Sequence, residues 1–289
     1  MKMRDLAEIQ PWDWPQTASV LILEMLRNGE APSDERQLAV ELAGDLVVMN
    51  DDLATELLRI LEDPSEPDSL RGQAAISFGA VLEEVGSMEG GVFDEWDVPA
   101  VTAPVFERAR AALRGAYQNL GYPKEVRRGA LEASARAPEP WHADAVRAAY
   151  GEEDPEWKLT SVFCMRFVPG FEAEIVEALE SDDPMTLFQA VEASRDQAVP
   201  QAWPRIRELA QTAASGIPPI PQHPGLGRSL VMAAMHAVAM IRPDKAEEML
   251  GPFIDSDDED LAEAAMGALD VAEVFLAEEE EAADPTLWN

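Results

Sequence analysis

Several residue types and patterns are scarce in this chain of 289 residues, and each scarcity excludes a class of protein. A single cysteine, Cys164, rules out an intramolecular disulfide. The three histidines, His142, His223 and His236, are far apart, and none has a metal-binding spacing. No run approaches the roughly 18 uninterrupted apolar residues of a membrane span, and the first residues lack the apolar segment of a signal peptide. We therefore expect a cytoplasmic location without membrane association.

Basic side chains are also scarce. The chain has 22 lysines and arginines against 56 aspartates and glutamates, and its formal net charge is −34. A chain of that charge repels DNA, RNA and anionic lipid surfaces, so direct nucleic-acid or membrane binding is not expected. A protein partner, including a basic one, is compatible with it. The hydrophobic content of 47% nevertheless excludes an intrinsically disordered chain.

Motifs that carry chemistry are equally sparse. No phosphate-binding loop, nucleophile elbow or dinucleotide fingerprint is present. The acidic run 255–260 starts like an EF-hand calcium loop, but Asp260 stands where that loop needs glycine and Met266 where it needs glutamate. We interpret it as a helix-capping turn, and Cys164 as a small buried residue. No catalytic residue, cofactor or metal ion is predicted, and the chain is not expected to be an enzyme.

What the sequence does contain is helical periodicity along almost its whole length. Apolar residues recur every three or four positions across 35–49 and again across 70–82, which is the spacing of one helix face. Prolines and acidic residues such as Pro104, Pro123 and Asp154 open several of these segments. No segment shows the clear alternation of a strand. The predicted fold class is therefore all-α.

Comparison of the chain with itself shows a repeated unit, in which a short helix and an acidic turn precede a second helix rich in alanine. The unit is clearest at 54–85, 173–194 and 246–276. Seven second helices align on one position near the helix start, namely Arg36, Arg71, Arg127, Lys158, Leu187, Arg228 and Ala262. One helix pair cannot bury its apolar face alone, so such pairs are expected to stack on one another.

The repeat resembles the HEAT-repeat family, in which a helix ends in Leu-x-Asp-x-Asp and is followed by Val-Arg and alanine-rich packing positions. The best matches run from Leu61 to Leu82 and from Phe253 to Leu269, and a third begins at Val126. The resemblance covers most of the chain, from about Trp14 to Leu276. It implies a right-handed, armadillo-like α-solenoid of stacked antiparallel helix pairs.

The resemblance also implies a ladder of Asp–Arg contacts between neighbouring repeats. Leu187 and Ala262 replace the usual basic residue, so the ladder is expected to break at both positions. Arg127 keeps the basic residue, and we expect it to be structural. Arg128 points about 100° away from Arg127 on the same helix, and we expect it to be freer to meet a partner.

The predicted organisation is a single solenoid of about seven helix pairs over residues 1–277, followed by an acidic C-terminal tail, 278–289. Two insertions interrupt it, at 86–104 and 215–227. The first carries Phe93 and Trp96, and the second holds four prolines around its histidine, His223. Each insertion is interpreted in two ways, because long loops often carry binding residues but also cover exposed edges or space neighbouring repeats.

Charge is unevenly distributed along the chain. Residues 108–147 carry a net charge of +4, the rest of the chain −38, and residues 244–289 alone −15. The basic segment either meets an acidic patch of a partner or neutralises acidic neighbours within the chain. The candidate partner-binding residues are Arg108, Arg114, Arg128, Phe93, Trp96 and His223.

The leading functional interpretation is a non-catalytic scaffold or adaptor that binds a protein on the concave face of the solenoid and on its insertion loops. HEAT-like helix pairs occur in scaffolds, transport receptors, lyases and DNA glycosylases, so the resemblance alone does not determine function. One alternative is an acidic inhibitor that neutralises a basic, nucleic-acid-binding protein. Another is a HEAT-like enzyme such as a lyase, for which the sequence offers no catalytic constellation.

Overall fold

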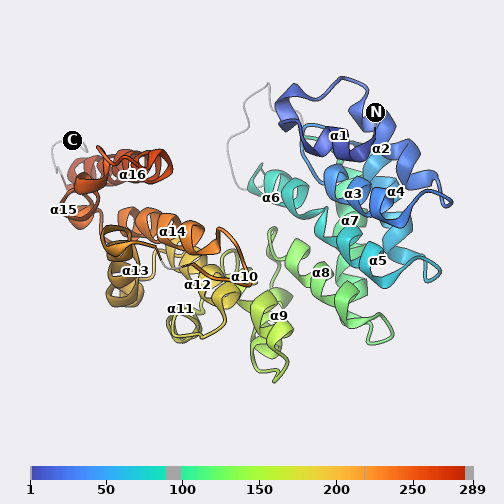
Figure 1. Cartoon of the computed structure of the whole chain (residues 1–289). Helices are drawn as coiled ribbons and strands as arrows, with labels where there is room; N and C mark the ends of the chain where they lie inside the picture. The colour runs from blue at the N-terminus through green and yellow to red at the C-terminus, as the bar shows by residue number, and fades with distance from the viewer. Residues whose placement is uncertain (1, 89–98, 218, 284–289) are drawn as a thin grey trace, which may run out of the picture. The chain divides into compact units, whose positions relative to one another are not determined.

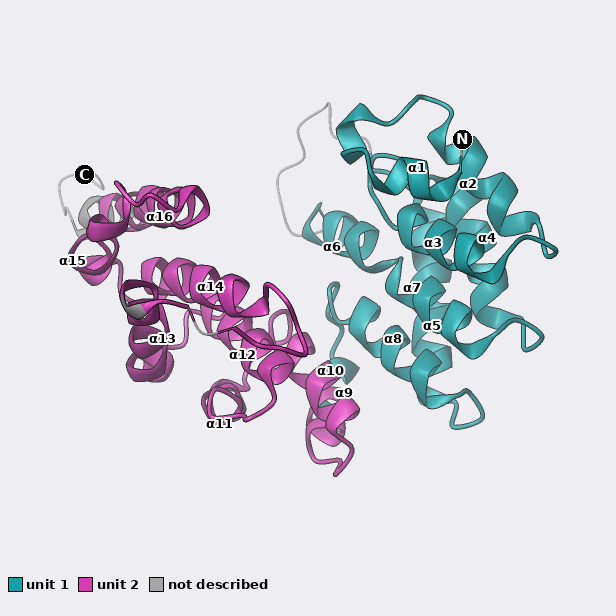
Figure 2. Cartoon of the chain, in the orientation of Figure 1, with its two compact units in different colours: residues 1–145 teal, residues 146–289 magenta. Residues whose placement is uncertain are grey.

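The computed structural model describes residues 2–88, 99–217 and 219–283, and every regular element in these ranges is helical. The absence of strands among them confirms the all-α prediction. None of the described helices is both long and apolar enough to cross a membrane. The chain divides into two compact units, Met1–Ala145 and Val146–Asn289, which Figure 2 colours separately.

The first unit holds two layers of helices (Figure 1). Hairpins form where α2 packs on α3, α4 on α5 and α7 on α8. Along one layer α2, α4 and α7 contact each other in turn, and along the other α1, α3, α5 and α8 do so. The bounds are α1 Met3–Ala7, α2 Ala18–Arg27, α3 Ser33–Ala43, α4 Asp51–Glu62, α5 Asp68–Ile76, α6 Gly79–Met88, α7 Ala103–Gln118 and α8 Lys124–Ser134.

The second unit repeats this pattern. α11 packs on α12, α13 on α14 and α15 on α16, while α10, α12, α14 and α16 contact each other in turn. The bounds are α9 Trp141–Tyr150, α10 Pro155–Cys164, α11 Glu172–Ala178, α12 Pro184–Asp196, α13 Trp203–Ser215, α14 Leu226–Ile241, α15 Ala246–Leu250 and α16 Glu259–Ala283. Helix α9 begins in the first unit and ends in the second. Short 3-10 helices occur at Pro11–Asp13, Pro200–Ala202, Pro243–Lys245 and Gly251–Phe253.

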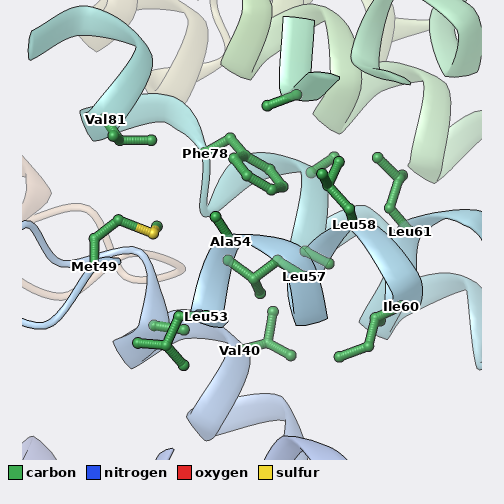
Figure 3. Close-up of a cluster of buried hydrophobic side chains, with 14 of the residues drawn as sticks. Val40, Met49, Leu53, Ala54, Leu57, Leu58, Ile60, Leu61, Phe78 and Val81 are labelled. Carbon is green, nitrogen blue, oxygen red and sulfur yellow. The ribbon is translucent and has the colours of Figure 1, made fainter. Parts of the chain in front are cut away.

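Helix α4 lies at the centre of the core of the first unit. The side chain of Asn50 caps its start by accepting hydrogen bonds from the backbone N–H groups of Asp52 and Leu53. Figure 3 shows the apolar side chains of α4 facing Val40 of α3 and Phe78, which follows α5. Because α4 has neighbours in both layers, Leu57, Leu58, Ile60 and Leu61 are all fully buried. Burial of each such side chain contributes about 1.5–3 kcal/mol.

The residues aligned by the repeat occupy equivalent places in the structure. All seven lie near the start of the second helix of a pair, in α3, α5, α8, α10, α12, α14 and α16. Six are the fourth residue of their helix, and Arg228 is the third of α14. The register of the second helices was therefore predicted correctly from the sequence.

Three of the aligned arginines reach back to the end of the preceding helix, and we call these three the arginine clamp. The C-terminal end of a helix leaves backbone carbonyls without hydrogen-bond donors and carries a partial negative charge. A guanidinium donates hydrogen bonds to these carbonyls and its positive charge offsets the partial negative charge. The hydrogen bonds run from Arg36 Nη2 to Leu26 O at 3.4 Å, from Arg71 Nε to Leu61 O at 3.1 Å, and from Arg127 Nε to Tyr117 O at 3.0 Å. The acceptor lies ten residues before the arginine in each case.

Two aligned arginines also reach forward to the acidic turn of the next helix pair. Arg36 makes a bidentate pair with Glu66, with both N···O distances at 2.8 Å. Arg228 Nη1 lies 2.5 Å from an oxygen of Asp258. These are the contacts that the repeat predicted between neighbouring pairs.

Where the aligned arginine or its acidic partner is missing, other groups take part. Arg71 places its guanidinium 5.0 Å from the centre of the Tyr122 ring in the next turn. Leu187 cannot donate a hydrogen bond, and the carbonyl of Leu179 at the end of the preceding helix instead accepts one from Arg205 Nε at 3.4 Å. The donor then comes from the following helix, α13.

One predicted helix ends early. The helix expected across 35–49 stops at Ala43, and the next residue, Gly44, lies against the end of α5. A Cβ on Gly44 would be 2.9 Å from the carbonyl oxygen of Ser77, so only glycine allows this approach. Leu46 and Val47, which the periodicity placed on a helix, are exposed in the turn that follows.

Another predicted helix is broken in two. The segment 70–82 is interrupted between α5 and α6, at Ser77 and Phe78. The single proton of the Ser77 hydroxyl is shared between the carbonyl oxygens of Gln73 at 3.0 Å and of Val40, in α3, at 2.7 Å. The contact with Val40 anchors the turn to the neighbouring pair, and apolar spacing within the segment gives no sign of it.

The predicted insertions and tail correspond to the following segments. α6 continues to Met88, beyond the predicted start of the first insertion, while Phe93 and Trp96 lie outside the described residues. The second insertion fits the gap between the end of α13 and the start of α14 at Leu226. α16 runs to Ala283, so it includes part of the predicted tail 278–289.

Helices α5 and α8 approach each other closely at two glycines, Gly72 and Gly129. A Cβ on Gly129 would lie 2.6 Å from the carbonyl oxygen of Gly72, so Gly129→Ala must push the two helices apart. We expect a loss of about 1–3 kcal/mol in the free energy of unfolding, measured by urea denaturation. Gly115→Ala in α7 is the matched control, because nothing lies within 4 Å of its Cβ position, and it should stabilise by about 0.5–1 kcal/mol. Equal effects of the two substitutions would contradict the close packing of α5 and α8.

Candidate functional site

Two adjoining hollows lie in the first unit, beside α6, α7 and the turn that follows α8. The first has a volume of about 240 Å³ and is lined by Glu83, Gly86, Ser87, Arg110 and Arg136, among others. The second has a volume of about 310 Å³, and its lining includes Glu107, Arg110, Arg114, Gln118 and Glu139. Arg110 lines both hollows. We call Arg110, Arg114 and Arg136, with the hollows that they line, the arginine surface.

The pattern of α7 places two of these arginines. Its apolar residues Phe106, Ala109, Leu113 and Ala116 recur at helical spacing and are buried. Arg110 and Arg114 are one turn apart on a different face. The amphipathic sequence of α7 therefore directs both guanidinium groups toward the second hollow.

Glycines of α6 place the third arginine. A Cβ on Gly79 would lie 2.8 Å from Arg136 Nε, and one on Gly86 would lie 2.9 Å from the Cβ of Ala137. The two glycines are seven residues apart and so share one face of α6, against which the residues after α8 pack. This seven-residue spacing is a sequence signal that composition and repeat analysis overlooked.

Acidic side chains of the unit itself compensate most of the positive charge. Arg136 Nη1 lies 2.6 Å from Glu83 Oε2, and Arg110 lies 3.2 Å from Glu107 and 3.3 Å from Glu139. For Arg110 and Arg136, these pairs favour the second interpretation of the basic segment, in which it neutralises acidic neighbours within the chain.

Arg108, a predicted partner-binding residue, is placed differently from the arginine surface. Its guanidinium lies 3.6 Å from Glu62 of α4, in the neighbouring helix pair. It lines neither hollow. The structure thus separates Arg108 from Arg114, although both belong to α7 and to the same basic segment.

Arg114 is held by an aromatic ring. Its guanidinium carbon lies 5.7 Å from the centre of the Trp141 ring, which is within range of a cation–π interaction. Trp141 in turn stacks on Tyr117 at 5.5 Å and donates a hydrogen bond from Nε1 to Glu139 at 3.0 Å. Across the described part of the chain, no acidic side chain forms a salt bridge with Arg114, which is exposed.

His142 anchors the turn that carries Trp141. The ring is fully buried and stacks on Trp141 at 3.7 Å. Its Nδ1 accepts a hydrogen bond from the backbone N–H of Glu139 at 2.8 Å, so the proton of the neutral ring lies on Nε2, 3.0 Å from Ser134 Oγ. Burial is the main cause that lowers the pKa of His142 to about 4. Spacing alone did not single out this residue, because its burial depends on tertiary packing.

Arg127 and Arg128 lie on α8. Arg127 is half-buried in the arginine clamp, and its guanidinium lies 5.7 Å from the centre of the Tyr117 ring. Arg128 is also half-buried and lies one turn before Glu132, with Arg136 one turn after it. Burial raises the pKa of Glu132, and the two arginine charges oppose that rise.

The other predicted residues lie away from the arginine surface. His223 is exposed in the turn 221–225, beside a hollow of about 340 Å³ that it does not line. That hollow is formed by neighbours of His223 in the insertion, such as Ile220, Pro221 and Pro224, together with Arg228. Phe93 and Trp96 belong to the segment outside the described residues, so they stay predictions.

Two interpretations of chemistry-bearing residues agree with the structure. Cys164 is fully buried in α10. Asp258 accepts a hydrogen bond from the backbone N–H of Leu261 at 3.4 Å, which makes the acidic run a turn that caps α16. In the ranges that the structure describes, no three His, Cys, Asp or Glu side chains are grouped so as to hold a metal ion.

Comparison with known proteins gives no relative: no protein-family model matches the chain, and no curated protein is significantly similar to it. Function is therefore inferred from geometry and charge.

The burial of His142 predicts a pH dependence of stability. The folded state holds the ring neutral down to about pH 4, whereas the unfolded chain binds a proton near pH 6.5. The stability that this histidine contributes is present above pH 6.5 and is lost as the pH falls toward 4, by at most about 1.4 kcal/mol per pH unit. His142→Gln keeps hydrogen-bonding groups in place and cannot titrate.

The measurement is the free energy of unfolding of both proteins from pH 7.5 to pH 4.5. We expect the difference between the native protein and His142→Gln to change by on the order of 2 kcal/mol in favour of the variant as the pH falls. All other titrating groups are common to the two proteins and cancel. A difference that stays constant with pH would show that His142 is not held neutral.

Proposed function

We propose that this protein is a non-catalytic scaffold that binds a protein partner through an acidic segment of that partner. The observation that carries the proposal is Arg114, which is exposed, fixed by Trp141 and not salt-bridged to any acidic side chain of the described residues. Arg207 is likewise exposed and makes no salt bridge within the described residues, but only Arg114 of these two is held by an aromatic ring. A carboxylate from outside supplies the missing partner.

The hollow beside Arg114 suits such a segment. Its volume of about 310 Å³ accommodates one or two side chains. Arg110 in its wall is already paired with Glu107 and Glu139, which leaves Arg114 as the cation that meets a ligand carboxylate. A guanidinium pairs with a carboxylate through two parallel hydrogen bonds, so a fixed arginine gives direction as well as attraction. Stacking on Trp141 lowers the entropy that Arg114 would lose on binding. The residue is therefore pre-organised for an acidic ligand.

The HEAT-like, right-handed α-solenoid belongs to the same proposal. Two features support it: consecutive second helices contact each other within each unit, and the arginine clamp recurs in three pairs. In a solenoid of about seven pairs the second helices line a concave face, which is the usual binding surface of such proteins. A partner that also reaches that face, contacts from the insertion loops and a cytoplasmic location are proposed with it; the hollow beside Arg114 lies on α7, a first helix, and is a separate contact.

A second candidate function is an acidic inhibitor that neutralises a basic protein. The charge of −15 over residues 244–289 supports it, as does the exposure of Asp257, Glu259 and Asp260. Salt distinguishes the two functions. Charge mimicry loses affinity steeply with ionic strength, whereas a fixed arginine in a partly enclosed hollow loses much less.

The test begins with partner capture from the native host by the purified protein, followed by binding measurements with the purified partner. We expect Arg114→Glu to weaken that binding by about tenfold or more, because it removes the carboxylate-binding group and adds a repelling charge. Arg207→Glu is the matched control: it makes the same charge change at an exposed position of α13. Both variants should unfold at the temperature of the native protein.

The outcomes separate the candidates. Loss of binding in Arg114→Glu alone supports the arginine surface. Equal, small effects of the two variants, together with a steep dependence on salt, would instead support the acidic inhibitor and contradict the role of Arg114.

A further inference from the structure

In the second unit, one side of α14 carries partly exposed methionines. On α14, Met232, His236 and Met240 are spaced by four residues and are half-buried, while the residues between them are almost all buried. These three side chains therefore form the side of α14 that its neighbouring helices leave uncovered. Methionine side chains are flexible and polarisable, and they suit surfaces that adapt to a partner.

Helix α16 continues this surface. It packs beside α14, and a Cβ on Gly267 would lie 3.8 Å from His236 Cε1, which brings the two stripes together. Met266 is 45% exposed and Val274 is 57% exposed. Val271 and Phe275 are also exposed. We call Met232, Met240, Val271, Val274 and Phe275 the methionine face; Met266 points about 180° away from Phe275 around α16 and does not belong to it.

Acidic residues border the methionine face. Glu263, Asp270 and Glu273 lie on the exposed side of α16, at helical spacing among its exposed apolar residues. Burial lowers the pKa of His236 below its usual value, which disfavours a positive charge on this ring. Apolar residues bordered by carboxylates are complementary to an apolar stripe bordered by lysines and arginines.

We propose that the methionine face binds a basic amphipathic helix of a partner protein. Such a helix places apolar side chains at positions i, i+3, i+4 and i+7 against methionines and valines, and its basic side chains against Glu263, Asp270 and Glu273. A second copy of this chain is a poor occupant, because it would bring the same acidic residues together. This site is independent of Arg114 and belongs to a different unit.

The probe is a synthetic peptide of about 18 residues, with leucine on one helical face and lysine on the other. The control peptide has the same composition in scrambled order, so it carries the same charge without an apolar face. Binding is measured by fluorescence anisotropy at about 0.15 M salt, where long-range attraction is screened. We expect the amphipathic peptide to bind at least about tenfold more tightly than the scrambled one.

Two matched variants locate the site. Val274→Asp and Val20→Asp each add one negative charge at a similarly exposed valine, 57% and 54% exposed, but only Val274 belongs to the methionine face. We expect Val274→Asp to weaken binding of the amphipathic peptide about fivefold or more, and Val20→Asp to leave it unchanged or slightly stronger. Arg114→Glu should not change it, which separates this proposal from the acidic-segment site.

Two results would contradict the proposal. If the scrambled peptide binds as tightly as the amphipathic one, the attraction is general electrostatics and the methionine face has no role. If Val274→Asp binds as well as Val20→Asp, the peptide occupies another surface and the proposal is wrong.

Discussion

The end of a helix inside a protein leaves carbonyl groups that need donors, and the way this chain supplies them shapes the rest of the fold. At three helix ends the donor is the guanidinium of the fourth residue of the next helix, namely Arg36, Arg71 or Arg127. Arg36 and Arg71 are only 8% and 5% exposed, so their charges have to be compensated close by. The forward contact with Glu66 does this for Arg36 and ties one helix pair to the next. Arg36 therefore both joins the two helices of its own pair and fixes the position of that pair relative to the next one.

Close approach of the second helices is the other constraint, and it also builds the candidate site. Gly72 and Gly129 bring α5 and α8 together, and Gly79 and Gly86 let the residues after α8 lie against α6. The same packing fixes Arg136 beside Glu83 and presents the turn that begins α9. The buried His142 holds this turn, and Trp141 carries Arg114. The arginine surface thus follows from contacts that serve stability.

Sequence alone was enough for local features and for the register of the repeat. Helix class and the starts of the second helices follow from periodicity, from prolines or acidic residues at helix starts and from an arginine at the fourth position, all of which are encoded locally. The break between α5 and α6 was not predictable in this way, because Ser77 bonds to Val40, 37 residues away. Similarly, nothing in the sequence distinguished Arg108 from Arg114. Only tertiary contacts give Arg108 a carboxylate and Arg114 an aromatic ring.

The most direct test of the arginine clamp as the link between pairs is a double-mutant cycle on Arg36 and Glu66. Arg36→Met keeps an aliphatic stem, Glu66→Gln keeps the shape of the acceptor, and the double variant removes the pair. Free energies of unfolding of all four proteins, measured in urea at pH 7, give the coupling between the two side chains. If the forward contact holds one pair to the next, the coupling is about 1–3 kcal/mol. A coupling near zero would contradict that role and leave Arg36 as a donor to Leu26 alone.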